Sequence, residues 1–240
     1  MMHLVKEKTE ENELYHVIQP IVDLTQDKII GFEFLLRSHK IPNPEKLFRL
    51  AKENDELNRL DQVSIFKILE TIHNKKEKLK DYLYFINVYP STLVNQTFLD
   101  LLNEVLLTWD INPNSIVFEL NESEVITDFD NLIGVANMLK EKGFLISVDD
   151  IGKGQANVKT VIEIEPHIAK LDLYFSKNLS KSTKKQEFIH HFSRFLGKHA
   201  KIVLEGLEYQ EDLQIARELG IPFGQGYFLG KPEAIETYLK

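Results

Sequence analysis

The sequence contains no cysteine, so disulfides, thiolate metal sites and cysteine nucleophiles are all excluded. It has no apolar run of the roughly 20 residues that a membrane-spanning helix needs. The first residues are charged and lack an apolar core, so we expect no secretory signal. The formal net charge of −8 argues against binding to long nucleic acids or anionic membranes. These absences predict a cytoplasmic protein that acts on neither DNA or RNA polymers nor membranes.

The composition is that of an ordinary globular protein. The chain has 240 residues, of which 43% are hydrophobic and 28% charged. This length suffices for one α/β barrel or for two small domains. Because there is no linker, low-complexity segment or short repeat, we expect a single domain over residues 1–240, with residues 1–12 as a short flexible lead-in.

Strand-like and helix-like segments alternate along most of the chain. Short apolar runs rich in β-branched and aromatic residues predict strands over 14–24, 29–36, 82–87, 115–120, 144–150, 167–172, 201–206 and 221–228. Helical periodicity or helix-start signals predict helices over 44–53, 57–75, 97–107, 128–142, 157–163, 181–196, 211–219 and 232–240. The first two strands form a hairpin and must be antiparallel, whereas the later alternation indicates parallel strands. We therefore predict a modified (β/α)8 TIM-like barrel with one antiparallel strand from the N-terminal hairpin.

Two adjacent carboxylates, Asp149 and Asp150, follow a buried strand and precede Gly152. Neighbouring ionised carboxylates repel each other unless positive charge offsets them, and a pair of divalent metal ions does this well. The alternative is an Asp-rich turn that caps the next helix.

The remainder of the chain favours the metal site. Nearly every predicted strand ends in a residue suited to metal or phosphoryl chemistry: Glu33, Asn87, Glu119, Asp149 with Asp150, Lys170, Glu205 and Gln225. The C-terminal strand ends of a barrel meet at one mouth, where barrel active sites lie. Carboxylate and amide oxygens suit Mg²⁺ or Mn²⁺, and two such ions could flank a phosphodiester. Lys170 is suited to hold or deprotonate a water there, and Arg37 to hold a phosphate or a guanine edge. The residues thus predict metal-assisted hydrolysis of a phosphate ester.

At these positions the chain resembles the EAL-domain family of cyclic di-GMP phosphodiesterases, as a stand-alone EAL domain. The resemblance is carried by seven motifs that appear in the family's order after an opening strand Tyr15-His-Val-Ile-Gln19-Pro20: Glu33-Phe34-Leu35-Leu36-Arg37, Asn87-Val88, Glu119-Leu120-Asn121-Glu122, Asp149-Asp150, Lys170-Leu171-Asp172, Glu205-Gly206-Leu207-Glu208 and Gln225-Gly226-Tyr227.

The resemblance implies a cyclic-guanylate-specific phosphodiesterase that opens c-di-GMP to linear pGpG with two Mg²⁺ or Mn²⁺ ions. One ion is expected at Glu33, Asn87, Glu119 and Asp149, and the second at Asp149, Asp150 and Glu205. The catalytic residues implied are Glu33, Lys170, Glu205 and Asp150. Ligand-binding roles are implied for Gln19, Leu35, Arg37, Asp172, Glu208, Gln225 and Tyr227. Glu122 is expected to anchor the loop after Asp150, and the family resemblance implies a homodimer.

Four departures from the family pattern leave alternatives open. Phe34 replaces the alanine of the name motif, Tyr89 replaces serine and Tyr209 replaces threonine. The loop that usually reads Phe-Gly-Thr-Gly-Tyr-Ser is here Ile151-Gly152-Lys153-Gly154-Gln155-Ala156. Because all expected metal ligands are present, catalysis is favoured. The alternatives are a catalytically inactive c-di-GMP receptor or protein-interaction module, and a barrel enzyme that acts on another phosphoester.

Overall fold

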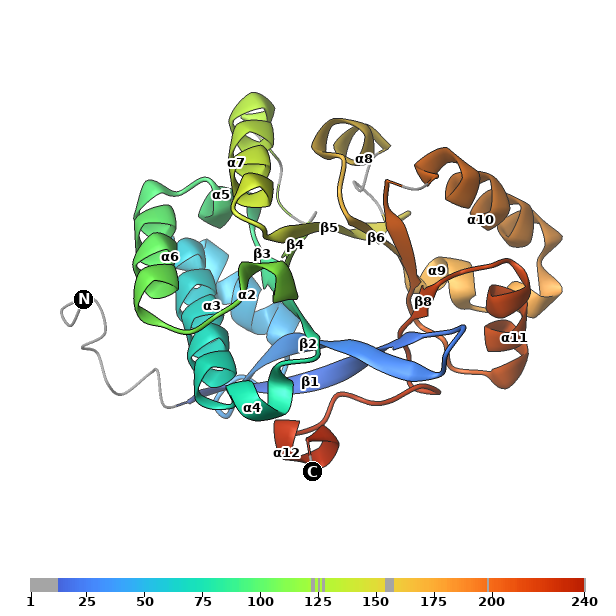
Figure 1. The fold of residues 1–240 in the computed structure, drawn as a ribbon, viewed down its shortest axis with the longest axis horizontal. Coiled ribbons are helices and arrows are strands. Elements are labelled where there is room, and N and C mark those ends of the chain that lie inside the picture. Colours follow the sequence, from blue (N-terminus) through green and yellow to red (C-terminus); the bar gives the residue numbers. More distant parts are fainter. Residues whose placement is uncertain are drawn as a thin grey trace.

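A computed structural model describes residues 13–121, 124, 126, 128–153, 158–197 and 199–239. Eight strands close into a barrel in sequence order (Figure 1). The strands are β1 (Leu14–Asp23), β2 (Lys28–Ser38), β3 (Leu83–Val88), β4 (Ile116–Leu120), β5 (Leu145–Ile151), β6 (Ile168–Leu171), β7 (Lys201–Leu204) and β8 (Phe223–Gly224). β1 is antiparallel to both β2 and β8, while the other neighbouring strands are parallel. The predicted barrel with one antiparallel strand is confirmed.

The turn at residues 23–28 sets the direction of β1. The carboxylate of Asp23 accepts hydrogen bonds from the backbone N–H groups of Thr25 and Gln26, and this closes a tight turn. Strands joined by so short a turn must run antiparallel. Gly31 in β2 lets β3 approach closely, since a Cβ there would lie 2.5 Å from the carbonyl oxygen of Leu83.

The helices lie around the outside of the barrel (Figure 1). In chain order they are α2 (Pro44–Glu53), α3 (Leu57–Asn74), α4 (Lys76–Leu79), α5 (Pro90–Leu93), α6 (Gln96–Thr108), η1 (Pro113–Ser115), α7 (Phe129–Glu141), α8 (Val158–Ile164), α9 (Leu173–Ser176), η2 (Leu179–Lys181), α10 (Thr183–Leu196), α11 (Gln210–Glu218) and α12 (Ile235–Tyr238). The side chains of Asn43, Asn95 and Asp128 cap α2, α6 and α7 by accepting backbone N–H groups. In the described part of the chain, no helix is both long and apolar enough to cross a membrane.

The protein has two hydrophobic cores, one outside the barrel wall and one inside the barrel. The larger core fills the space between strands and helices, whereas the smaller one consists of Ile21, Phe85, Val117, Ile168 and Val203. Residues two apart on a strand share a face. The side chains two positions beyond the last four of these residues therefore point into the same interior: Asn87, Glu119, Lys170 and Glu205. The small core therefore packs inside the barrel directly beneath these polar groups.

Two predicted elements near the C-terminus are much shorter than expected. β8 spans Phe223–Gly224 instead of 221–228, because the chain then turns around Leu207: Gln225 and Phe228 both form backbone hydrogen bonds with it. A Cβ at Gly226 would lie 2.2 Å from the carbonyl oxygen of Leu207. The helix predicted over 232–240 is only α12, since Glu233 is held extended by two backbone hydrogen bonds to Ile18 of β1.

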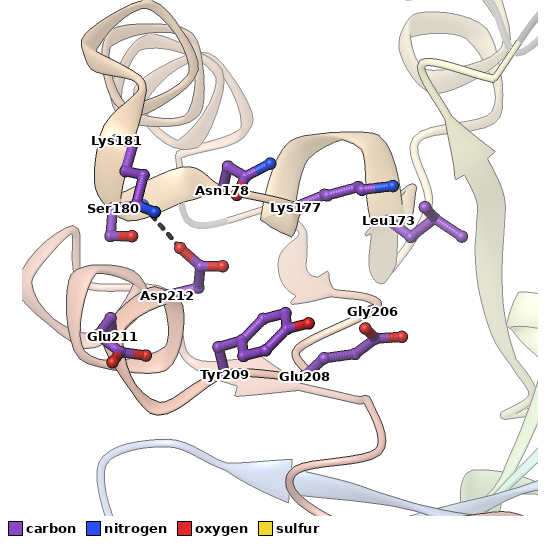
Figure 2. Close-up of a pocket in the computed structure, with 10 residues that line it drawn as sticks. All are labelled: Leu173, Lys177, Asn178, Ser180, Lys181, Gly206, Glu208, Tyr209, Glu211 and Asp212. Carbon is purple, nitrogen blue, oxygen red and sulfur yellow. Dashed lines mark hydrogen bonds between the residues drawn. The ribbon is translucent and has the colours of Figure 1, made fainter.

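A cavity of about 600 Å³ opens where α9, η2 and the loop before α11 meet (Figure 2). Asp212, one of its lining residues, accepts the backbone N–H of Ser180 at 2.7 Å and so ties α11 to η2. The cavity contains none of the predicted metal ligands, but Leu173, Gly206 and Glu208 on its rim also border the barrel mouth.

Candidate active site

The polar strand ends converge on one lysine at the mouth of the barrel. Lys170 is fully buried, and its Nζ lies within ion-pairing distance of four carboxylates. The distances are 3.3 Å to Oε2 of Glu33, 2.9 Å to Oε1 of Glu119, 3.2 Å to Oδ1 of Asp149 and 2.8 Å to Oε1 of Glu205. Residues from four strands, together with Glu205 directly after β7, thus form one compact charged cluster.

The cluster has too little positive charge, because one ammonium faces four carboxylates. An ammonium has three N–H groups and cannot direct one at each of four carboxylates. Accordingly, Oε1 of Glu119 and Oδ1 of Asp149 are buried and accept no well-directed hydrogen bond from the described residues. Burial and the neighbouring carboxylates raise the pKa of Asp149 and raise that of Glu119 well above its usual range, although Lys170 opposes this. Burial likewise raises the pKa of Glu205 to about 8.

The pKa shifts of Lys170 and Glu33 both favour the charged form. Burial alone would lower the pKa of Lys170, but the four surrounding carboxylates outweigh it and raise the pKa well above its usual range. Burial alone would raise the pKa of Glu33, but Lys170 and two amide donors outweigh it and lower the pKa. Those donors are Gln225 Nε2, 2.7 Å from Oε2 of Glu33, and Asn87 Nδ2, 2.9 Å from its Oε1. Gln19 in turn accepts from Gln225 at 3.2 Å.

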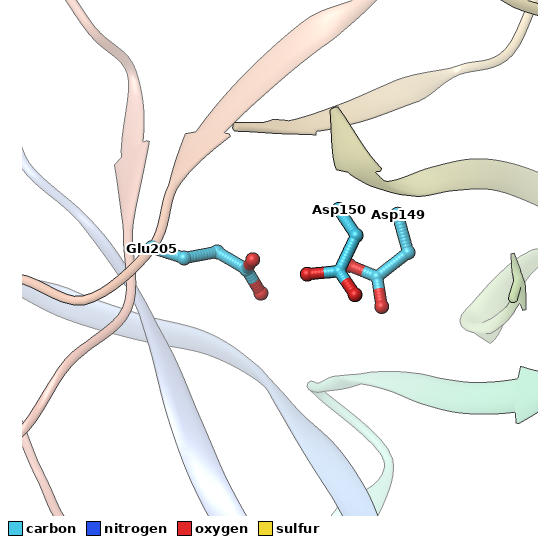
Figure 3. Close-up of side chains that lie close together, drawn as sticks. All are labelled: Asp149, Asp150 and Glu205. Carbon is cyan, nitrogen blue, oxygen red and sulfur yellow. The ribbon is translucent and has the colours of Figure 1, made fainter. Parts of the chain in front are cut away.

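The backbone of Asp150 brings two adjacent carboxylates to the same place. Successive residues of a regular strand point to opposite sides, but the pairing of β5 with β6 is irregular between Val148 and Ile151. Asp150 itself has a φ of +52°, a left-handed conformation that is uncommon outside glycine. As a result, Asp149, Asp150 and Glu205 offer ligand oxygens that all lie within 4.8 Å of one another (Figure 3).

The residues present fit divalent metal ions. Both expected ligand sets consist of hard oxygen donors, which Mg²⁺ and Mn²⁺ prefer. The set at Asp149, Asp150 and Glu205 is already close enough to share an ion. The other set includes the buried, unsatisfied oxygens of Glu119 and Asp149. Divalent ions would supply the positive charge that the cluster lacks.

Two cavities flank the metal ligands, and Glu33 borders both. One, of about 270 Å³, contains five of the predicted ligand-binding residues, namely Gln19, Asp172, Glu208, Gln225 and Tyr227. The other, of about 200 Å³, contains the remaining two, Leu35 and Arg37, together with Phe48, Asp61 and Tyr89. The structure therefore divides the predicted ligand-binding residues between two sides of the cluster. Asp172 also caps α9 by accepting the N–H of Tyr174 at 2.8 Å.

Comparison with known proteins identifies the family. The model of the EAL domain matches residues 4–232. The chain belongs to the EAL domain family. It is 24% identical over 242 residues to the cyclic di-GMP phosphodiesterase PdeF of Escherichia coli K12, and 27% identical over 248 residues to the probable cyclic di-GMP phosphodiesterase PdeI of the same organism. These alignments cover 98% of this chain but only 32% of PdeF and 31% of PdeI, so the chain spans about a third of their length.

A solved structure of the EAL enzyme Bd1971, with cAMP and cyclic di-GMP bound, superimposes with a TM-score of 0.86. The match covers 95% of this chain and 64% of the other, at 22% sequence identity. At this identity the likeness supports the fold, which is that of an EAL barrel.

The described departures from the EAL pattern occupy different positions relative to the metal ligands. Phe34 points outward, where it is buried with its ring centroid 6.5 Å from those of His16 and Tyr84, while Glu33 points inward. Tyr209 is 61% exposed at the start of α11. Tyr89 lines the smaller cavity together with Glu33 and Asn87. The Nζ of Lys153 lies 3.0 Å from Oδ2 of Asp150. Glu122 and residues 154–156 of the altered loop fall outside the described residues.

Asp61 is a site residue that the sequence analysis missed. It lies on α3 at the wall of the smaller cavity, is 2% exposed, and accepts the backbone N–H of Tyr89 at 2.9 Å. Tyr89 follows Asn87 by two residues, so Asp61 fixes the end of the strand that carries a predicted metal ligand. Burial raises the pKa of Asp61 to about 7, with hydrogen bonds from Tyr89 and Thr92 opposing the shift. The only sequence signal was an acidic residue among the apolar positions of a helix.

We expect Asp61→Asn to reduce the loss of stability that accompanies rising pH. A carboxyl whose pKa is raised on folding stabilises the fold fully below its unfolded pKa, near 3.8, and this contribution is lost as pH rises through about 7. Asparagine can still accept the N–H of Tyr89 but carries no charge. Urea unfolding with chelator at pH 5 and pH 8 should show the variant gaining about 2–3 kcal/mol on the wild type between the two values. Equal pH responses of the two proteins would contradict this assignment.

Proposed function

We propose that this EAL domain is a phosphodiesterase that hydrolyses c-di-GMP to linear pGpG with the help of two divalent ions, Mg²⁺ or Mn²⁺. The observation that supports the proposal is the convergence of Glu33, Glu119, Asp149 and Glu205 on Lys170, beside two cavities. The names of PdeF and PdeI and the cyclic di-GMP bound to Bd1971 support the same substrate.

The two cavities favour a substrate with two bases. A cyclic dinucleotide carries its phosphodiesters between two nucleosides, and here the metal ligands lie between two hollows of about 200 and 270 Å³. Arg37 lines the smaller one and is suited to hydrogen bond a guanine edge, while Tyr227 lines the larger one and is suited to stack on a base. A simple phosphomonoester would need only one of them.

The chain's own residues would bind the metal ions, orient the substrate and balance the charge of the site. When bound, the metal ions supply Lewis acidity toward the phosphodiester. Glu33, Asn87, Glu119 and Asp149 would hold one ion, and Asp149, Asp150 and Glu205 the other. Lys170, whose pKa the surrounding carboxylates raise, would act as a hydrogen-bond donor to the attacking water or to the developing charge on the phosphoryl oxygens. A water oxygen forms a bond to phosphorus as the bond to the ribose O3′ breaks, and the departing oxygen takes up a proton.

We also propose that the whole chain, 1–240, acts as one EAL domain in the cytoplasm and that it forms a homodimer. The exposed apolar side chains of α8, α9 and α10 support an interface on that side of the barrel: Val158, Ile162, Leu173, Tyr174, Phe188 and Phe195. Light scattering of the purified protein would give twice the chain mass for a dimer and the single mass for a monomer.

Incubation of the purified protein with c-di-GMP and Mn²⁺ or Mg²⁺, followed by chromatography of the nucleotides, tests the proposed activity. We expect pGpG to appear with either ion and not with chelator. Tight binding of intact c-di-GMP without product would instead favour the catalytically inactive receptor. Hydrolysis of other phosphodiesters in preference to c-di-GMP would favour an enzyme with a different substrate.

A further inference from the structure

Lys153 lies at the rim of the larger cavity and contacts a predicted metal ligand. Its Nζ is 3.0 Å from Oδ2 of Asp150, and its side chain is 63% exposed. Among the described residues that line this cavity it is the sole lysine or arginine, and the carboxyl-bearing residues Glu33, Asp150, Asp172, Glu205 and Glu208 line the same cavity. Glu33 and Glu205 also pair with the buried Lys170, whereas Asp150 pairs with Lys153.

The backbone holds Lys153 over Asp150. The N–H of Lys153 donates to the carbonyl oxygen of Asp150 at 2.9 Å, so residues 150–153 form a tight turn. Gly152 in this turn has a φ of +100°, and a Cβ there would lie 2.3 Å from the ring of Phe175. Lys153 and Asp150 are therefore joined both by a backbone hydrogen bond and by an ion pair. The turn therefore places the side chain of Lys153 beside the carboxylate of Asp150.

Each carboxylate of the second metal site already has an ammonium beside it. Lys170 lies 3.2 Å from Asp149 and 2.8 Å from Glu205, and Lys153 lies 3.0 Å from Asp150. A lysine side chain is cationic at neutral pH. A divalent ion that binds Asp150 must displace this ammonium or tolerate its repulsion at close range. Because the side chain of Lys153 is largely exposed, it can swing into solvent when this happens.

We propose that the ammonium of Lys153 competes with the second metal ion for the carboxylate of Asp150. Lys153 thereby raises the divalent-ion concentration at which the second metal site fills. This inference rests on the proposed function, because it presupposes metal binding at Asp149, Asp150 and Glu205. It assigns to the altered loop a definite role: the domain is tuned to load its second ion at a higher free metal concentration. A neutral residue at position 153 would remove the competitor.

The test is a calorimetric titration of Mn²⁺ into metal-free protein without nucleotide. We expect Lys153→Thr to tighten the weaker binding event by about fivefold, the upper range for an exposed ion pair. Lys153→Arg keeps the charge and should bind like the wild type. Lys28→Thr removes one positive charge at the opposite end of the barrel and serves as the matched control, which should also bind like the wild type.

A double-mutant cycle ties the effect to Asp150. In an Asp150→Asn background, Lys153→Thr should change Mn²⁺ affinity no further, because the competing ion pair is already lost. Equal or weaker Mn²⁺ binding by Lys153→Thr than by the wild type would overturn the inference while leaving the proposed function intact. Absence of Mn²⁺ binding by both proteins would overturn the inference and the proposed metal dependence together.

Discussion

Replacing Lys170 by methionine is expected to lower the free energy of unfolding by about 3–5 kcal/mol at neutral pH without metal, the usual cost of removing one partner from a buried ion pair. Methionine matches the length of the lysine stem but leaves Glu33, Glu119, Asp149 and Glu205 facing one another in the barrel. The loss should shrink at pH 5, where the carboxyl groups bind protons, and when Mn²⁺ supplies the missing charge. Urea unfolding under these three conditions measures each expectation.

Lys201→Met is the control for Lys170→Met, because Lys201 is an exposed lysine at the start of the adjacent strand β7. It should change stability by less than about 0.5 kcal/mol. If Lys170→Met were as stable as the wild type at neutral pH with chelator, the four carboxylates would not depend on Lys170, and the electrostatic description of the mouth would be wrong.

Replacing Glu33 by glutamine should lower the rate of c-di-GMP hydrolysis by about 10²–10³-fold, the scale of losing a group that stabilises the reacting charge. Glu33 is held ionised by Lys170, Asn87 and Gln225, and it borders both cavities. Glutamine nearly conserves shape but removes the charge and turns an N–H₂ toward one of the two amide donors. Turnover and Mn²⁺ affinity should therefore fall together.

Glu77→Gln, the same substitution at an exposed position on α4, is the control and should leave both turnover and Mn²⁺ affinity unchanged. A Glu33→Gln protein that folds and still hydrolyses c-di-GMP at the wild-type rate would remove Glu33 from the metal-binding set.

The strand ends could be predicted because they obey a local rule. A polar residue two positions after a core residue, such as Glu119 after Val117, shares its face, and parallel strands bring such residues to one mouth. The same rule is silent on the backbone of Asp150, whose left-handed conformation depends on the irregular pairing of β5 with β6. The rule also could not predict that Lys153 contacts Asp150, since this contact requires the turn through Gly152 to pack against Phe175.

Elements with few local signals were predicted least well. The segments that became β8 and α12 carry apolar residues at plausible spacing, but contacts with Leu207 and Ile18, distant in sequence, decide their length. Asp61 was missed for a related reason. Its role comes from the backbone of Tyr89, which lies 28 residues further along the chain.

Diffraction from crystals grown with Mn²⁺, recorded at the manganese absorption edge, tests most directly whether the barrel mouth is a two-metal centre. We predict two anomalous peaks: one among Glu33, Asn87, Glu119 and Asp149, and a second among Asp149, Asp150 and Glu205. The second peak should gain occupancy as the Mn²⁺ concentration is raised, in line with competition from Lys153. Crystals that show no peak at the mouth even at high Mn²⁺, or peaks bound only by residues outside these two sets, would contradict the account.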